Sequence, residues 1–328
     1  MLSAIITKLT GESLLDYLRP RLFDPLGIEN PTWETGPRGI NLGGTGLHIK
    51  TEDIARLGQM YLQKGMWEDK RILTEEWIAE ATKATSDNSN TQTNPDWTAG
   101  YGYQFWRCRH NCYRGDGAFG QYCIVMPKQD AVLAITSGLR DMQAVLDKVW
   151  EHLLPAMQPE ALPAAPQAYG ELREKLARLS LPVPEGQRSS PTAEQWSKKT
   201  VRLESNELGI ERVAIAFGDE RSTLIVRDEQ GEHAMPVGYA TWLKGTTNVH
   251  EGADEPVAAC GAWTAEDTYE VRICYSERVF CPVFRFHYPG DELQLDVEPN
   301  ASWGPATVRT IAGRVTDLET PTPAAYCG

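Results

Sequence analysis

Three glycines within six positions mark YRGDGAFGQYCIVMPK, residues 113–128, as a stretch whose backbone can approach a ligand closely. They are Gly115, Gly117 and Gly120, and a β-strand pattern follows them directly. Because glycine has no Cβ, a strand edge this bare can come close to a substrate. Such an edge does no chemistry without a nucleophile or a base, and the stretch holds neither in obvious form.

A second cluster of reactive side chains is CRHNC, which places Cys108, His110 and Cys112 within five residues. Thiolate and imidazole groups are ligands of zinc. No second Cys or His pair stands nearby at zinc-finger spacing, so we expect free thiols beside a hairpin turn. The sequence thus predicts no structural metal here and no cofactor.

Composition restricts the classes of function. The chain has 328 residues, 41% hydrophobic and 23% charged, which suits two globular domains. A net charge of −13 argues against nucleic acid as a partner, and no apolar run reaches the ~18 residues of a membrane span. The odd number of cysteines argues against a disulfide framework and favours reduced thiols in a cytoplasmic protein. They lie at positions 108, 112, 123, 260, 274, 281 and 327.

Helices and antiparallel strands are expected to position these groups over residues 1–155, as an α+β arrangement. Apolar spacing and capping residues predict a helix over 2–10 that Gly11 closes, and further helices that begin at Ser13, at Thr51 as N-cap, at Thr74 and at Asp141. Strands are predicted over 100–107, 120–126 and 130–136. Alternation places Tyr101, Tyr103 and Phe105 on one face, which is either core or, for Tyr103, part of a substrate site.

The rest of the chain has a different character. Residues 156–195 form a proline-rich linker with a short helix around 168–179. From 196 to 328, short alternating runs at hairpin spacing predict an antiparallel β-barrel or sandwich that folds on its own. Its core is expected to hold four aromatic residues, with a ligand-lined interior as the alternative: Trp242, Trp263, Tyr269 and Tyr275.

Four segments of the first region, taken in order, resemble the serine β-lactamase-like hydrolases. That group holds class C β-lactamases, penicillin-binding proteins, esterases, D-aminopeptidases and 6-aminohexanoate-oligomer hydrolases. The resemblance covers residues 1 to about 155 and is to the C-terminal part of the catalytic domain. The segments are SAIITKLTGESLLDYLRPRLFDPLGIEN, GGTGLHIKTEDIARLGQMYLQKGMWEDKRILTEEWIAEAT, YGYQFW and GDGAFGQYCIVMPKQDAVLAITSG.

The resemblance implies acyl transfer from a small-molecule amide or ester to a serine. The family chemistry needs Ser-x-x-Lys for the nucleophile and Tyr-x-Asn or Tyr-x-Ser for proton transfer. Neither motif occurs in this sequence. In the family both lie upstream of the helix at which the chain begins, so we expect a chain that is inactive alone. The surface that Leu2, Ile5, Ile6 and Leu9 would leave bare predicts self-association.

The third family motif, Lys-Thr-Gly or His-x-Gly on a strand, corresponds by position to Gly115, Asp116 and Gly117. Gly115 replaces the basic or imidazole residue, which is a departure from the family. The resemblance makes the backbone N–H of Ala118 a candidate oxyanion donor. It also makes His48 and Gln121 candidate substrate contacts, whereas the alternative for residues 115–120 is a tight hairpin entry alone.

Two further functions stay open on the sequence. One is a non-catalytic binding or regulatory protein, in which a degenerate hydrolase half supports a β-barrel. The other is one half of a split enzyme whose nucleophile belongs to a separate polypeptide.

Overall fold

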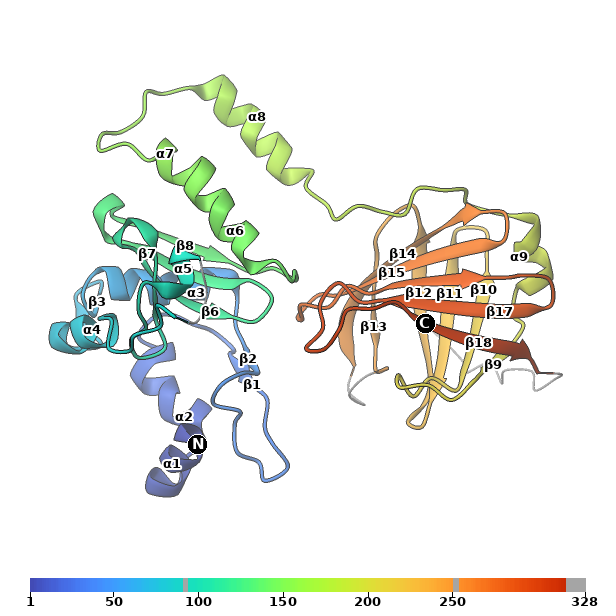
Figure 1. The fold of residues 1–328 in the computed structure, drawn as a ribbon, viewed down its shortest axis with the longest axis horizontal. Helices are drawn as coiled ribbons and strands as arrows, with labels where there is room; N and C mark the ends of the chain where they lie inside the picture. Colours follow the sequence, from blue (N-terminus) through green and yellow to red (C-terminus); the bar gives the residue numbers. More distant parts are fainter. Residues whose placement is uncertain (91–93, 250–253, 317–328) are drawn as a thin grey trace. The chain divides into compact units, whose positions relative to one another are not determined.

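The computed structural model describes residues 1–90, 94–249 and 254–316 of the chain. The chain divides into two compact units, residues 1–163 and residues 164–328 (Figure 1). Cys327 lies outside the described residues.

The first unit combines helices with short antiparallel sheets. Its helical segments are α1 (Leu2–Thr10), α2 (Leu14–Leu18), η1 (Arg19–Phe23), α3 (Thr51–Leu62), α4 (Glu75–Ala81), α5 (Pro95–Thr98), η2 (Arg109–Asn111), η3 (Pro127–Gln129), α6 (Met142–Lys148), η4 (Val149–Leu153) and α7 (Leu154–Ala156). Its strands are β1 (Thr32–Trp33), β2 (Leu47–His48), β3 (Met66–Trp67), β4 (Lys70–Arg71), β5 (Trp106–Arg107), β6 (Tyr113–Gly117), β7 (Gln121–Met126) and β8 (Ala131–Ile135).

The main sheet of this unit has the antiparallel order β5-β6-β7-β8 and is covered on both faces (Figure 1). Tyr122, Ile124 and Met126 of β7 pack with Leu146 of α6 in one core. The other face receives α3, which packs against β7 and β8. Gly58 of α3 permits this approach, because a Cβ there would overlap the side chains on β7 and β8.

Most of the predicted helix starts are confirmed. The side chains of Ser13, Thr74 and Asp141 each accept a backbone N–H of the following first turn, and Gly11 closes α1 with φ 76°. Thr51 was wrongly predicted as an N-cap: it is the first residue of α3 and Lys50 is the N-cap. Asp53 stabilises this start, because its carboxylate accepts the Lys50 N–H at 3.2 Å.

The strands predicted over 120–126 and 130–136 are confirmed, but the strand predicted over 100–107 is confined to β5. Gln104 has φ 65°, and the Gly102 N–H donates to the Phe105 carbonyl at 2.7 Å, so the chain turns here. Tyr103 and Phe105 therefore do not share a face. Phe105 is buried, whereas Tyr103 is 46% exposed.

The second unit begins with two helices and continues as β-strands. They are α8 (Pro166–Ala177), α9 (Pro191–Trp196), β9 (Val201–Leu203), β10 (Arg212–Phe217), β11 (Arg221–Asp228), β12 (Gly231–Tyr239), β13 (Leu243–Thr247), β14 (Glu255–Ala265), β15 (Thr268–Tyr275), β16 (Val283–His287), β17 (Glu292–Glu298) and β18 (Arg309–Val315). The short helix predicted around 168–179 corresponds to α8.

The strands of the second unit close into a barrel. Within the described ranges the order is β12-β11-β10-β9-β18-β17-β16-β15-β14, and neighbours pair antiparallel. Parallel pairing of Gly238 with Cys260 and of Tyr239 with Gly261 joins β12 to β14 and completes the circle. β13 pairs with the same edge of β14 further along. Of the two predicted architectures, a barrel or a sandwich, the structure is a barrel.

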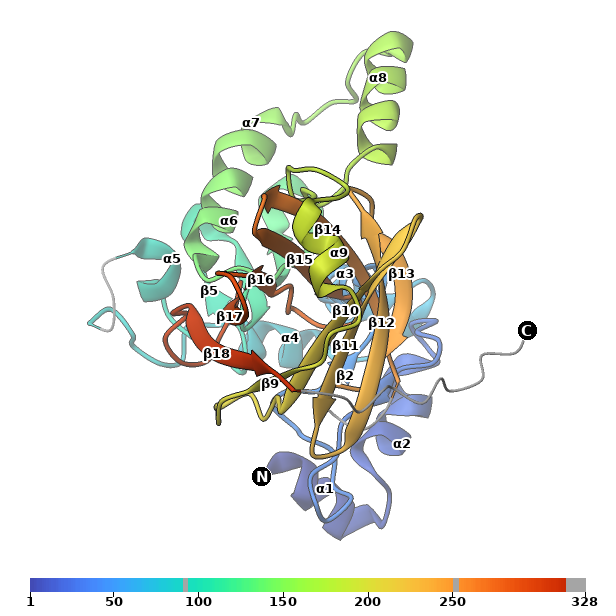
Figure 2. The same cartoon turned by 90° about the vertical axis from the view of Figure 1, so that its right-hand side faces the viewer.

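Aromatic side chains fill the barrel interior. Trp263, Tyr269 and Tyr275 are buried there, as predicted. Trp242 was wrongly assigned to the core: it is half-buried, and its indole N–H donates to the Leu181 carbonyl at 2.9 Å. Helix α9 lies beside the barrel in Figure 2. Its Trp196 is buried, unlike Trp242.

Candidate active site

The glycine-rich segment forms one antiparallel hairpin. Gly115 of β6 lies opposite Cys123 of β7, and Gly117 lies opposite Gln121. The turn between the strands places Phe119 at φ 65° and Gly120 at φ 91°. The three glycines thus occupy one strand and its turn, which agrees both with a tight hairpin and with a strand-borne motif.

The glycines differ in what they allow. At Gly120 a Cβ would overlap the hydroxyl of Ser137, and the positive φ adds strain for any other residue. At Gly115 a Cβ would meet only the ring edge of Phe105, at 3.9 Å. The strand therefore needs glycine at 120, whereas at 115 it has room for a Cβ.

Gln121 and Ser137 hold the turn in place. The Gln121 amide donates to the carbonyl of Ser137 at 2.5 Å and to that of Ala118 at 3.4 Å. The Ser137 hydroxyl donates back to the Gly120 carbonyl at 2.6 Å. Within the described part of the chain, the Ala118 N–H has no hydrogen-bond acceptor. The turn is fixed by its carbonyls and leaves this donor available.

Asp116 lies on the face of β6 opposite to Gly115 and Gly117, where a buried arginine holds it. The Arg114 Nε donates to the Asp116 carboxylate at 3.1 Å, and the indole of Trp106 hydrogen-bonds to the same group. Burial raises the pKa of Asp116 above its usual value, and Arg114 opposes that shift. The result is a sheltered, hydrogen-bonded carboxylate adjacent to the glycine hairpin.

Arg114 is the functional-site neighbour that sequence reasoning missed. It is fully buried, its guanidinium lies 4.3 Å from the ring centroid of Trp97, and Nη1 donates to the Asp96 carbonyl at 2.7 Å. Its Nη2 is buried and has no hydrogen-bond partner among the described residues. Strand alternation, which puts positions 114 and 116 on one face, is the signal that could have found it.

The structure does not unite all the candidate residues. His48 of β2 lies against Glu34, with Nε2 and Oε1 3.1 Å apart. The segment that follows β2 contacts the main sheet through Thr51. The Thr51 hydroxyl lies 3.1 Å from the hydroxyl of Thr136, the residue before Ser137. Direct contact between His48 and the hairpin is absent from the interactions of the described residues.

Tyr103 packs away from the hairpin. Its ring centroid lies 5.7 Å from that of Trp77, and its N–H donates to the Ala81 carbonyl at 2.8 Å. These contacts attach it to α4. The role of Tyr103 in substrate binding stays a prediction.

The CRHNC thiols lie in a core. Cys108 and Cys112 are buried, and burial raises the pKa of both thiols, that of Cys112 to about 12. The Arg114 Nη1 hydrogen-bonds to the Cys108 sulfur at 3.0 Å, while the His110 ring stacks near Trp150. No group of three or more His, Cys, Asp or Glu side chains in the described ranges is arranged to hold a metal ion.

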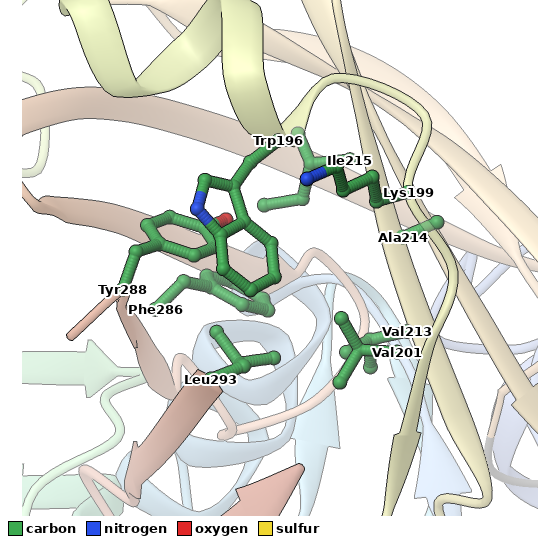
Figure 3. A pocket seen from close by; sticks show the side chains of 9 residues that line it. All are labelled: Trp196, Lys199, Val201, Val213, Ala214, Ile215, Phe286, Tyr288 and Leu293. Atoms are coloured by element: carbon green, nitrogen blue, oxygen red, sulfur yellow. The ribbon is translucent and has the colours of Figure 1, made fainter. Parts of the chain in front are cut away.

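The second unit has a pocket beside α9 that is too narrow for a substrate site (Figure 3). All its lining residues except Lys199 are hydrophobic, and the ring centroids of Trp196 and Tyr288 lie 4.7 Å apart at its wall. The lining residues are Trp196, Lys199, Val201, Val213, Ala214, Ile215, Phe286, Tyr288 and Leu293. The rings of Trp263, Tyr269 and Phe217 contact one another in tilted and edge-to-face arrangements, with centroids 5.0–5.2 Å apart.

Comparison with known proteins identifies the class of the first unit. Residues 1–158 match the Beta-lactamase family, and this part of the chain has the β-lactamase-related hydrolase fold. The match ends close to the end of α7. None of the described helices is long and apolar enough to cross a membrane.

Several solved structures are similar to this chain over part of their length. A candidate 6-aminohexanoate-dimer hydrolase from Bacillus anthracis is 22% identical, with a TM-score of 0.38 over 48% of this chain and 43% of that one. An octameric penicillin-binding protein homologue from Pyrococcus abyssi is 15% identical, with a TM-score of 0.35 over 95% and 63%. A candidate β-lactamase from Bacteroides dorei is 14% identical, with a TM-score of 0.31 over 42% and 50%. The chain spans 43%, 63% and 50% of the lengths of these three proteins, in that order.

Proposed function

We propose that the first unit contributes the strand-borne part of a serine acyl-transfer site that hydrolyses a small-molecule amide or ester. The sequence has no Ser-x-x-Lys and no Tyr-x-Asn or Tyr-x-Ser. The acyl-accepting serine, its lysine and the tyrosine would therefore come from outside these 328 residues, from a preceding segment or a separate polypeptide. This chain alone would not hydrolyse by the covalent route.

The observation that carries the proposal is the unused N–H of Ala118 at the tip of the β6–β7 hairpin. Gln121 and Ser137 fix the turn through its carbonyls, so the N–H direction is set before a substrate arrives. A donor fixed in this way stabilises a developing oxyanion without reorganisation. In this proposal Gly115, Asp116 and Gly117 are the strand that runs along the substrate, and Gln121 and His48 border it.

The exposed face of α1 supports the need for a further segment. Leu2, Ile5 and Leu9 are 76%, 44% and 77% exposed, and their spacing places them along one side of the helix. Ile6 is half-buried. An apolar stripe of this kind favours self-association of the isolated chain, which light scattering across a concentration series would detect.

The test compares this chain with a protein in which an upstream segment carrying Ser-x-x-Lys and Tyr-x-Ser precedes it. Both are treated with a fluorophosphonate probe and with nitrophenyl butyrate. We expect no labelled serine and no turnover in this chain, and one labelled serine with turnover in the extended protein. Stoichiometric labelling of a serine in this chain, with turnover, would contradict the proposal.

Ala118→Pro in the extended protein tests the oxyanion donor, because proline removes the N–H, although it also fixes φ at about −65° and restricts Gly117 before it. We expect kcat to fall about 100- to 1000-fold while the probe still labels the serine. Ala118→Ser keeps the N–H and is the matched control. Equal activity of the two variants, at equal thermal stability, would exclude Ala118 as the donor.

The presence of glycine at position 115 supports a second candidate function, that of a non-catalytic binding or regulatory protein. The family places a basic or imidazole residue at this point, and a Cβ would meet no close contact there, yet the chain has glycine. If the extended protein is also unlabelled by the probe, this second function replaces the first.

A further inference from the structure

Cys274 and Cys281 face each other across the β15–β16 hairpin. The register of these strands pairs Thr268 with His287 and Arg272 with Val283, which places 274 opposite 281. Two backbone hydrogen bonds continue the ladder past the ends of the strands. The Ile273 N–H donates to the Pro282 carbonyl at 3.1 Å, and the Tyr275 N–H donates to the Phe280 carbonyl at 3.0 Å.

These two bonds make 274 and 281 a non-hydrogen-bonded pair, because hydrogen-bonded and non-hydrogen-bonded pairs alternate in an antiparallel ladder. The Cα atoms of such a pair lie about 4.5 Å apart, which is within the range that a disulfide spans. Both residues are free and half-buried. Solvent reaches the pair, and the Cα separation of such a pair fits a disulfide.

We propose that Cys274 and Cys281 form a reversible dithiol–disulfide pair that reacts with small diffusible disulfides. The Cys274 thiol loses its proton, and its thiolate attacks one sulfur of R–S–S–R. A mixed disulfide forms as one RS⁻ leaves and takes up that proton. The Cys281 thiol then attacks the Cys274 sulfur, closes the intramolecular disulfide and loses its proton to the second RS⁻. The protein loses two electrons and two protons, and the diffusible disulfide becomes two thiols.

The electrostatics assign the order of attack. The hydrogen bond from Cys281 lowers the pKa of the Cys274 thiol to about 7, and the same interaction raises the pKa of Cys281. A thiol with a pKa near the ambient pH attacks fastest. Cys274 is thus the attacking residue and Cys281 the resolving one.

The bond would fasten one end of the barrel. The Cys281 N–H donates to the Asn300 side chain at 2.6 Å, and the Asn300 amide donates to the Val279 carbonyl at 2.8 Å. The hairpin is thereby tied to the segment that follows β17. Oxidation should raise the thermal midpoint of the barrel by about 5 °C.

The experiment oxidises the full chain with oxidised glutathione and digests it with trypsin without reduction. Cleavage after Arg272, Arg278 and Arg285 puts the two cysteines on separate peptides, 273–278 and 279–285. We expect these peptides to appear linked and to separate on reduction. A chain that carries only glutathione adducts, that keeps both thiols free, or that links either peptide to Cys260 would overturn the proposal.

Three variants fix the roles of the thiols. In Cys281→Ser, glutathione should accumulate on Cys274. In Cys274→Ser, glutathione should accumulate on Cys281 instead, and neither variant should give linked peptides. Cys260→Ser is the matched control, since Cys260 is on the adjacent strand, and it should leave the linked peptides unchanged. In the natural chain, quenched with acid early in the reaction, a first adduct on Cys281 rather than on Cys274 would refute the assigned order.

Discussion

Gly120 is the residue on which the hairpin geometry depends most. A Cβ at this position would overlap the Ser137 hydroxyl, and that hydroxyl is already committed to the Gly120 carbonyl. We expect Gly120→Ala to lower the free energy of unfolding by about 2 kcal/mol, from the positive φ and the lost hydrogen bond together. Thermal and urea denaturation would measure the change.

The control for this prediction is Gly44→Ala. A Cβ at Gly44 meets no atom within 4 Å, and no positive φ is needed there. Its effect on stability should stay within about 0.5 kcal/mol. If the two variants lose equal stability, the hairpin does not depend on the close approach to Ser137.

At the residue scale, the sequence pointed to the segment of the candidate site but not to how that segment is packed. The glycine cluster pointed to residues 113–128 because glycines stand out in any composition. The room at Gly115 and the burial of Arg114 could not be predicted, because they depend on Phe105 and Trp97, which reach the hairpin only through the tertiary fold.

At the scale of elements, Asp96 joins several helical segments of the first unit. Its fully buried carboxylate accepts Arg109 Nε at 3.0 Å, Gln143 Nε2 at 3.0 Å and Trp150 Nε1 at 2.9 Å. Burial alone would raise its pKa, but these hydrogen bonds outweigh burial and lower it to about 2. The ionised carboxylate therefore connects α5 with η2, α6 and η4.

This network predicts a pH-dependent stability. Because the pKa is lowered in the folded state, the stabilisation is present above the unfolded pKa of about 4 and is lost as the pH falls towards 2. A shift of this size corresponds to about 2 kcal/mol at neutral pH. Asp96→Asn should cost at least that much at pH 7, and its difference from the natural chain should shrink between pH 4 and pH 2.

Asp147→Asn is the matched control, because Asp147 also accepts Arg109 and Gln143 but its side chain is 51% exposed. Its effect should be below about 1 kcal/mol. Urea unfolding at several pH values would separate the variants. A constant difference between Asp96→Asn and the natural chain across this range would rule out the network as its cause.

Capping and alternation patterns predicted helices and strands correctly where neighbouring residues determine the structure. They failed where contacts with distant residues determine it. Ser13, Thr74 and Asp141 cap helices through N–H groups in the next turn, which the sequence shows directly. The strand predicted over 100–107 failed because Gly102 and Tyr103 turn towards α4, where Tyr103 bonds to Ala81. Alternation of side chains cannot report a contact of that kind.

At the scale of the whole molecule, the alternating runs predicted strands but not closure. Closure depends on the parallel pairing of β12 with β14, which brings Gly238 to Cys260 and leaves β13 on the same edge. No sequence pattern distinguishes this arrangement from two stacked sheets. The prediction that Trp242 lies in the core was wrong because it also depends on a distant contact. Its indole donates to the carbonyl of Leu181, which precedes the barrel strands in the chain.

The closed barrel with its single aromatic core predicts that the second unit folds independently. The segment before α9 takes part, because Leu181 accepts Trp242, Pro182 accepts Arg272 at 2.9 Å, and Gln187 exchanges two 2.8 Å backbone hydrogen bonds with Trp263. A polypeptide of residues 180–328 should give a β-type circular dichroism spectrum and one cooperative thermal transition.

The shorter polypeptide 190–328 is the informative comparison. It keeps α9 and the barrel strands but lacks the acceptors of Trp242 and Arg272 and both bonds to Trp263. Each missing hydrogen bond should cost about 1 kcal/mol, reduced in part because water replaces the lost partner. The thermal midpoint of 190–328 should therefore lie about 5–10 °C below that of 180–328, with the same circular dichroism spectrum. A helical or unfolded spectrum for 180–328 would mean that the barrel needs the first unit to fold. Equal midpoints for the two polypeptides would mean that residues 180–189 only pass over the barrel surface without stabilising it.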